Sequence, residues 1–349
     1  MKKYIDLEDM VNTNCSNVLD IIQKNENISR KRITELTGLS WGGMTKIVNK
    51  LLENGYIVEK KSQPTSKSGR IPSIISVNNQ KNYIIGLDIN NVGFKGIVMN
   101  LSGQILKTYQ KPVVATTKDQ LLKEIISFTD MIFSNFKADV IVAIGVAMQG
   151  IVDSKNGISV KYPGISDWKN ISIRTLLAEK FKVHVFIEHD PDCLLYSYIN
   201  NSSSKNISLF RIDKSIGMAV SLNGKILKGK GILEIAHNTV IPNGKMCSCG
   251  MKGCLEAYIS SDDKTHNSID DFLLPLCITI KNSVNLFNSD TVIITGDLMN
   301  DLKSYESKLL KMLQDFNCSA QIKFCEIADN AVLGVSLLAI RNTINSLEI

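Results

Sequence analysis

Four potential metal ligands lie close together in the second half of the sequence, and no other feature constrains the fold as strongly. One imidazole and three thiols fall within 18 residues: His237, Cys247, Cys249 and Cys254. Such ligands at tetrahedral reach select zinc, and three cysteines with one histidine leave no position open for a catalytic water. Gly250 and Gly253 can bend the chain around a metal. The pattern predicts a structural zinc site; four unrelated residues or a redox-active thiol group are the alternatives.

The composition is that of a globular protein with more than one domain. The 349 residues exceed the usual size of a single core, and 44% hydrophobic with 21% charged residues excludes a disordered chain. The longest mostly apolar stretch, 331–340, is about half the length of a membrane-spanning helix, and the N-terminus lacks the apolar segment of a secretory signal. We therefore expect no membrane association and a cytoplasmic location, where cysteines remain thiols or bind metals.

Positive charge is concentrated at the N-terminal end. Residues 1–80 contain 12 Lys and Arg against 8 Asp and Glu, which gives +4 of the total net charge of +6, and the other 269 residues give +2. This surplus favours a polyanionic partner, although a few lysines on a solvated face would produce the same count.

A helix-turn-helix is expected between residues 15 and 52. Apolar residues recur at helical spacing in 15–24, Ser29 can cap a second helix to about Thr37, and Ser40 can cap a third. The third helix has one apolar stripe, formed by Met44, Ile47, Val48, Leu51 and Leu52. Side chains off this stripe would reach a DNA major groove. The expected DNA contacts are Ser29, Arg30, Ser40, Trp41, Thr45 and Lys46, although any compact three-helix bundle shows such stripes.

A wing is expected directly after these helices. Residues 56–60 and 71–77 have the pattern of two strands, and 62–69 form a polar loop between them. Arg70 lies at the base of this wing, where an arginine can enter a narrow minor groove or bind phosphates. The alternative is a solvated loop. The prediction is a winged helix-turn-helix domain in residues 1–80, with double-stranded operator DNA as its partner.

The rest of the chain, 81–349, alternates strand-like runs with helices, which predicts an α/β body. The expected strands are 83–88, 95–99, 140–147, 183–188 and 291–295, and the expected long helix is 118–136.

Several motifs resemble those of the ROK family (repressors, open reading frames and kinases). Segments 28–30, 37–40 and 68–70 resemble its winged helix, and 247–256 matches its Cys-x-Cys-Gly-x-x-Gly-Cys-Leu-Glu motif throughout, which argues against unrelated cysteines. The resemblance covers roughly residues 14–345. It implies that the effector domain has a two-lobed, actin-like or ribonuclease-H-like sugar kinase fold. Lobe one is expected at about 81–190 plus the C-terminal helix, and lobe two at about 191–330 with the zinc site.

The resemblance also implies a sugar pocket. Asp190 stands where the family's kinases carry their general base, and His189 replaces the family's asparagine, which suggests an altered ligand or a structural histidine. Glu234 and His237 match the family's Glu-x-Gly-His segment, and Glu256 matches the glutamate after the last cysteine. The five expected sugar contacts are therefore His189, Asp190, Glu234, His237 and Glu256.

The phosphate-binding loops of the family's kinases are altered in this chain. Asn90, Asn91 and Val92 replace Gly-Gly-Thr in the first loop, and Asp213 brings a carboxylate into the second. Bare backbone is needed for close approach to phosphates, and a carboxylate repels them. We therefore expect no catalysis, but a sugar-responsive transcription regulator that represses carbohydrate-utilisation genes as a homodimer or a dimer of dimers. The alternatives are a ROK-type sugar kinase that uses ATP, and a scaffold protein with a vestigial pocket.

Overall fold

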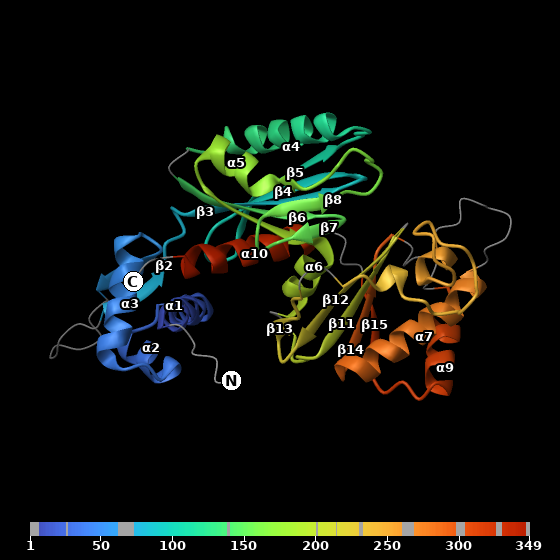
Figure 1. The fold of residues 1–349 in the computed structure, drawn as a ribbon. Coiled ribbons are helices and arrows are strands. Elements are labelled where there is room, and N and C mark those ends of the chain that lie inside the picture. Colours follow the sequence, from blue (N-terminus) through green and yellow to red (C-terminus); the bar gives the residue numbers. More distant parts are fainter. Residues whose placement is uncertain are drawn as a thin grey trace.

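The computed structural model describes residues 7–25, 27–61, 73–137, 140–199, 202–213, 215–229, 233–259, 269–297, 304–325 and 330–346. Figure 1 shows a small, mostly helical N-terminal unit beside a body that contains two five-stranded sheets. The fold is mixed α/β, as predicted. No helix within the described ranges combines the length and the apolar character that a membrane span requires.

The N-terminal unit is a winged helix-turn-helix. It comprises α1 (Leu7–Lys24), α2 (Arg30–Thr37), α3 (Trp41–Glu53), β1 (Ile57–Lys61) and β2 (Ser73–Val77). The side chains of Ser29 and Ser40 cap α2 and α3 by accepting backbone hydrogen bonds, as the sequence predicts. Gly38 ends α2 in the left-handed conformation, with φ of 68°, and thus makes the turn between the two helices. The strands β1 and β2 pair antiparallel and form the wing.

The first body sheet has the strand order β10-β6-β3-β4-β5. Its strands are β3 (Tyr83–Asn90), β4 (Gly93–Met99), β5 (Ile105–Pro112), β6 (Ile141–Met148) and β10 (His184–His189). Strands β3, β6 and β10 run parallel, so their carboxyl ends meet at one edge. Helices α4 (Lys118–Phe133) and α5 (Ile173–Phe181) cover one face, and α10 (Asn330–Asn345) covers the other (Figure 1). A small sheet, β7 (Ile151–Asp153), β8 (Ile158–Lys161) and β9 (Ile171–Ser172), precedes α5 in the chain.

The second body sheet has the order β13-β12-β11-β14-β15. Its strands are β11 (Ile207–Ile212), β12 (Ile216–Leu222), β13 (Lys225–Ile226), β14 (Thr291–Thr295) and β15 (Gln321–Phe324). Helices α7 (Ile269–Phe287) and α9 (Glu306–Asp315) lie on its outer side, and α6 (Asp190–Ile199) lies between the two sheets beside α10 (Figure 1). Two short 3-10 helices, η2 (Ile235–His237) and η3 (Leu255–Tyr258), flank the cysteine-rich segment.

The N-terminal unit shares one hydrophobic core with the first body sheet and α10. Leu19 and Ile22 of α1 belong to the same buried cluster as Ile340 and Ile344 of α10. Hydrogen bonds add to this contact: the Ser16 hydroxyl donates to the Asn345 side chain, and the Gln23 amide donates to the Leu101 carbonyl. The winged helix therefore packs directly on the body.

Helices α6 and α10 approach each other very closely. A Cβ atom at Gly334 of α10 would lie 1.8 Å from the carbonyl oxygen of Cys193 in α6. Only glycine fits at this crossing, because any side chain would force the two helices apart.

Candidate functional site

The predicted metal ligands come together in three dimensions. The ligand atoms of His237, Cys247, Cys249 and Cys254 all lie within 4.8 Å of one another. The Sγ atoms of Cys249 and Cys254 are 3.7 Å apart, and the Nδ1 atom of His237 is 3.7 Å from the Sγ atom of Cys247. A disulfide is excluded at this distance, since a sulfur–sulfur bond measures about 2.05 Å.

The local chain forms a tight knuckle that directs these side chains inward. The amide of Gly250 donates to the carbonyl of Cys247 at 2.9 Å, and the amide of Cys247 donates to the carbonyl of Met251 at 2.8 Å. Gly253 has φ of 81°, and a Cβ atom there would lie 1.8 Å from the carbonyl oxygen of Ile241. The glycine is therefore required for the turn that brings Cys254 back to the other ligands.

The cluster fits a tetrahedral zinc ion. Zn–S bonds of about 2.3 Å and Zn–N bonds of about 2.0 Å place tetrahedral ligand atoms roughly 3.5–3.8 Å apart. The two separations of 3.7 Å match this range. Burial raises the pKa of the Cys254 thiol to about 12, and a bound divalent cation would favour its thiolate.

A cleft of about 600 Å³ opens beside this cluster. It lies where the carboxyl ends of β10 and β11 meet, a common ligand position in α/β folds. The lining includes all five residues expected to contact a sugar: His189, Asp190, Glu234, His237 and Glu256. His237 and Glu256 connect the cleft to the cysteine cluster, because the Oε2 atom of Glu256 lies 3.7 Å from Nδ1 of His237.

A partly buried arginine, which no sequence motif indicates, organises one end of the cleft. The Nη1 atom of Arg211 lies 2.5 Å from Oδ2 of Asp190, and its Nε atom lies 2.7 Å from Oδ2 of Asp213. Burial raises the pKa of Asp190 to about 6, and the Arg211 charge opposes this shift. The neighbouring acids raise the pKa of Arg211 above its ordinary value despite burial, so the guanidinium stays charged.

Asp88, at the end of β3, faces the same group of charges. Burial raises its pKa to about 7, with the Asp190 charge adding to the shift and Arg211 opposing it. Its Oδ1 atom is buried and has no hydrogen-bond partner among the described residues. A second cation lies nearby: Lys228 Nζ is 2.8 Å from Glu188 and 2.6 Å from Asp192.

Backbone amides of the segment after β3 are occupied by side chains of the protein itself. The Oδ1 atom of Asn90 accepts hydrogen bonds from the amides of Val92, at 3.0 Å, and Gly93, at 3.2 Å. The amide of Asn91 donates to Oε1 of Gln149 at 3.1 Å. These donors are therefore already satisfied without a bound anion.

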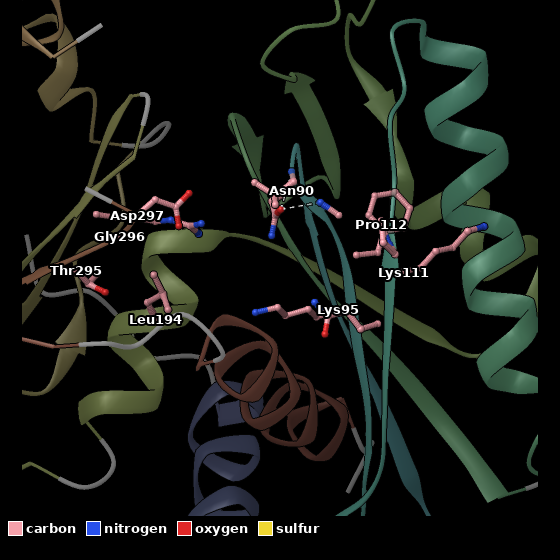
Figure 2. Close-up of a pocket in the computed structure, with 13 residues that line it drawn as sticks. Asn90, Lys95, Lys111, Pro112, Leu194, Thr295, Gly296 and Asp297 are labelled. Atoms are coloured by element: carbon pink, nitrogen blue, oxygen red, sulfur yellow. Dashed lines mark hydrogen bonds between the residues drawn. The ribbon is translucent and has the colours of Figure 1, made fainter. Parts of the chain in front are cut away.

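A second cavity of about 300 Å³ lies next to this segment. Figure 2 shows Asn90, Lys95 and Lys111 on one side of it and Thr295, Gly296 and Asp297 on the other. Arg211 lines both this cavity and the larger cleft, so the guanidinium and its carboxylate partners stand between the two.

The expected DNA contacts that the structure describes lie in α2 and α3 and at the N-caps of these two helices. Trp41 is 57% exposed at the start of α3, and Lys46 is exposed on the same helix. The hydroxyls of Ser29 and Ser40 accept the capping hydrogen bonds. The Thr45 hydroxyl is buried and has no partner within the described part of the chain. Arg70 lies outside the described residues.

Arg30 makes contacts within the winged helix. Its guanidinium donates to Glu59 on β1, at 3.1 and 3.0 Å, and to Asn49 on α3, at 3.1 Å. These bonds tie α2 to α3 and to the wing. They also hold the pKa of Glu59 below its ordinary value, together with a hydrogen bond from Ser73.

Comparisons with known proteins agree with the two parts of the structure. The sequence profile of the ROK family matches residues 84–262, which is 179 of the 349 residues, and a winged helix-turn-helix DNA-binding profile matches residues 16–58. The chain is 29% identical over 318 residues to the xylose repressor of Bacillus spizizenii, covering 81% of each protein.

Two solved structures show the fold. The crystal structure of a ROK family transcriptional regulator, described as a homologue of the Escherichia coli Mlc protein, superposes with a TM-score of 0.83 at 18% identity and covers 96% of this chain and 97% of the other. The ROK hexokinase of Thermus thermophilus superposes with a TM-score of 0.63 at 20% identity and covers 74% of this chain and 97% of the other. The effector part thus has the ROK sugar-kinase-like fold.

Proposed function

Because the chain belongs to the ROK family, we propose that it is a sugar-responsive transcriptional repressor of carbohydrate-utilisation genes. The winged helix, residues 1–80, binds operator DNA, and a monosaccharide or sugar derivative binds in the cleft of the effector domain, residues 81–349. The observation that supports this proposal most strongly is the combination of two features in one chain. A winged helix packs on a kinase-like body, and side chains of the protein occupy the amides of the loop after β3. Acting on chromosomal DNA, the protein would work in the cytoplasm.

The exposed face of α3 supports the DNA-binding part of the proposal. Trp41 and Lys46 face solvent at the helix that enters the major groove in helix-turn-helix proteins. Ser29 and Ser40 would add polar contacts to phosphates or bases, and Arg70 would contact DNA from the wing. Thr45 would contribute only through its partly exposed apolar atoms, because its hydroxyl is buried. Arg30 has a second role, because its bonds to Glu59 and Asn49 hold the recognition helix against the wing.

The side chains of the cleft support the sugar-binding part. Carboxylates accept hydrogen bonds from paired hydroxyls, and three of them, Asp190, Glu234 and Glu256, line the cleft. A structural Zn²⁺ held by His237 and the three cysteines would fix the segment that carries Glu256. The ion would act here as a cross-link.

Two features argue against phosphoryl transfer. A kinase needs free backbone donors and cations around the nucleotide phosphates, yet Asn90 and Gln149 occupy the amides of the first loop. The guanidinium of Arg211 is held between Asp190 and Asp213, so Asp190 is already paired in the position where it would act as a base. We therefore propose a binding protein rather than an enzyme.

The regulator would act as a homodimer or as a dimer of dimers. Paired recognition helices would contact two half-sites of a pseudo-palindromic operator. Sugar binding would change the angle between the two lobes and, through it, the spacing of the two winged helices. Sugar then controls repression if the spacing of the winged helices in the sugar-free and the sugar-bound protein differs and only one of the two fits the operator well.

The test is a binding titration with the full chain. Fluorescent duplexes tiled across the DNA upstream of its own gene are compared with a scrambled duplex, with and without D-xylose, D-glucose or N-acetylglucosamine. We expect one duplex to bind at least about 1,000-fold more tightly than the scrambled one, and one sugar to change that affinity. Lys46→Ala should weaken DNA binding and leave sugar binding unchanged. Glu234→Gln should weaken sugar binding and leave DNA binding in the absence of sugar unchanged.

The proposal is wrong if the chain shows no sequence preference and instead consumes ATP in the presence of a sugar. Loss of that activity on changing Asp190→Asn would identify a ROK-type sugar kinase. The titration and a parallel assay of sugar-dependent ATP consumption therefore separate the repressor from the alternative enzyme.

A further inference from the structure

Two buried side chains at the Asp190 end of the cleft lack partners for one polar atom each. Tyr162 is 3% exposed and His189 is 5% exposed, and both line the cleft. The Tyr162 hydroxyl and the Nδ1 atom of His189 have no hydrogen-bond partner among the described residues. Buried polar groups are nearly always paired, so these two atoms indicate where a polar ligand binds.

Tyr162 is held rigidly in this position. It follows β8, and its ring packs on Trp168 with the ring centroids 5.5 Å apart. Trp168 is itself fixed by a hydrogen bond of 2.9 Å from its Nε1 atom to the Ser159 hydroxyl. Burial, with the charges of Asp88 and Asp190 adding to it, raises the pKa of Tyr162, so the phenol stays protonated and can donate.

His189 is a neutral acceptor at its free nitrogen. Burial lowers its pKa to about 4, against the opposing charges of Asp192 and Glu188, so the ring is uncharged near neutral pH. Its Nε2 atom lies 3.6 Å from Oδ1 of Asp190, beyond hydrogen-bond distance, but the negative charge of the carboxylate favours the tautomer with the ring proton on that side. The Nδ1 atom therefore carries a lone pair and can accept a hydrogen bond from a ligand hydroxyl.

We propose that Tyr162 is a further sugar-contacting residue and that, with His189, it selects a neutral hydroxyl-bearing end of the effector. The phenol donates to one sugar oxygen, and Nδ1 of His189 accepts from one sugar hydroxyl. This inference rests on the proposed function and deepens it, because it states what chemical groups the sugar carries at the end that lies beside Asp190.

The same end of the cleft excludes a phosphorylated sugar. A phosphate monoester is mostly dianionic near neutral pH, so it is a poor donor to a neutral imidazole, and it would meet the carboxylates of Asp190 and Asp213. Arg211, which lines this end of the cleft, is already paired with both of these acids, and Lys228 is paired with Glu188 and Asp192. The effector therefore carries a free hydroxyl at the position that a kinase would phosphorylate.

Removing the Tyr162 hydroxyl should weaken sugar binding without weakening the fold. Since the protein supplies no partner for it within the described residues, Tyr162→Phe leaves no other group unpaired and should not weaken the fold. A bound sugar loses one hydrogen bond, which corresponds to about 2- to 12-fold weaker binding. A structural role would instead lower the melting temperature.

The chain offers a matched control. The Tyr109 hydroxyl, on β5, is also buried without a partner in the described ranges, but Tyr109 does not line the cleft. Wild type, Tyr162→Phe and Tyr109→Phe are compared as full chains by calorimetric titration and thermal unfolding. The ligands are D-xylose, D-glucose and N-acetylglucosamine, with the terminal phosphate of each sugar. An unphosphorylated sugar should bind best, and only Tyr162→Phe should weaken it.

Three results would overturn the inference while leaving the repressor proposal intact. They are unchanged sugar affinity in Tyr162→Phe, a melting temperature in that variant lowered by more than about 2 °C, and tighter binding of a phosphorylated sugar. If none of these sugars or sugar phosphates binds, the inference and the sugar-responsive part of the proposed function both fail. DNA binding, measured separately, would then decide whether a repressor remains.

Discussion

Substitution of Ile344→Ala, near the C-terminus, should loosen the DNA-binding helices more than 300 residues away in the sequence. The Ile344 side chain is 1% exposed and belongs to the buried cluster that includes Leu19 and Ile22 of α1. Truncating a buried isoleucine to alanine costs about 2–5 kcal/mol, because contacts are lost and a cavity remains. If the winged helix and α10 share one core, the substitution must destabilise both of them.

Hydrogen exchange measured on peptides is the suitable assay, since it reports local stability along the chain. A loss of 2 kcal/mol corresponds to roughly a 25-fold faster exchange of the protected amides. We expect this acceleration in peptides from α1 as well as from α10. Leu313→Ala is the control, because Leu313 is 2% exposed but packs in the core of the second sheet. It should accelerate exchange in α7 and α9 and leave α1 unchanged.

The reasoning is refuted if Ile344→Ala accelerates exchange in α10 alone. The winged helix would then be an independent unit that only touches the body. Two separate unfolding transitions in the wild-type chain, with α1 unfolding first, would lead to the same conclusion.

Two further predictions concern the cysteine cluster and the wing. Each purified chain should contain one zinc ion by elemental analysis. Removal of the zinc by a chelator should lower the melting temperature and should weaken sugar binding before DNA binding, because His237 and Glu256 line the cleft. Full stability without metal would contradict this prediction. The lowered pKa of Glu59 stabilises the folded state above the unfolded-state pKa of about 4.3, and this contribution is lost as the pH falls through the folded-state value. The free energy of unfolding of Glu59→Gln should therefore fall less steeply with acid than that of the wild type. Identical pH profiles of the two proteins would show that the Glu59–Arg30 pair does not cause the loss of stability in acid.

Local sequence signals predicted those parts of the structure that depend on local physics. The caps at Ser29 and Ser40 could be predicted because a capping side chain bonds to a backbone only a few residues away. The cysteine-rich knuckle could be predicted because its ligands and its turn glycines lie within a short segment. The helix expected to extend to about residue 136 ends at Phe133, because the amides of Asn135 and Phe136 turn to the carbonyls of Ile132 and Phe133, three residues back, and close the last turn in 3-10 geometry.

Long-range partners account for what the sequence could not predict. Arg211 stands within an apolar strand, and only the meeting of β11 with α6 places it against Asp190. Tyr162 gave no signal, because its importance depends on a cleft assembled from distant segments. Arg30 was expected on the DNA-facing surface, yet its guanidinium bonds to Glu59, a strand residue 29 positions later.

The helix that begins at the cleft leads to the winged helix through two contacts. Asp190 is the first residue of α6, and α6 crosses α10 at Gly334 with no space for a side chain. Further along the same pair, Arg341 of α10 hydrogen-bonds Tyr196 of α6 and faces the charge of Asp20 on α1.

A tight crossing cannot absorb a displacement of α6, because packed helices have few alternative arrangements. A change at the cleft that moves α6 must therefore move α10 or break its contact with α1. Allosteric coupling of about 1–3 kcal/mol is typical, and it changes an affinity by about 5- to 150-fold. Arg341→Met should reduce this factor for sugar and operator while leaving each separate affinity nearly unchanged. An undiminished factor would show that the coupling takes another route through the body.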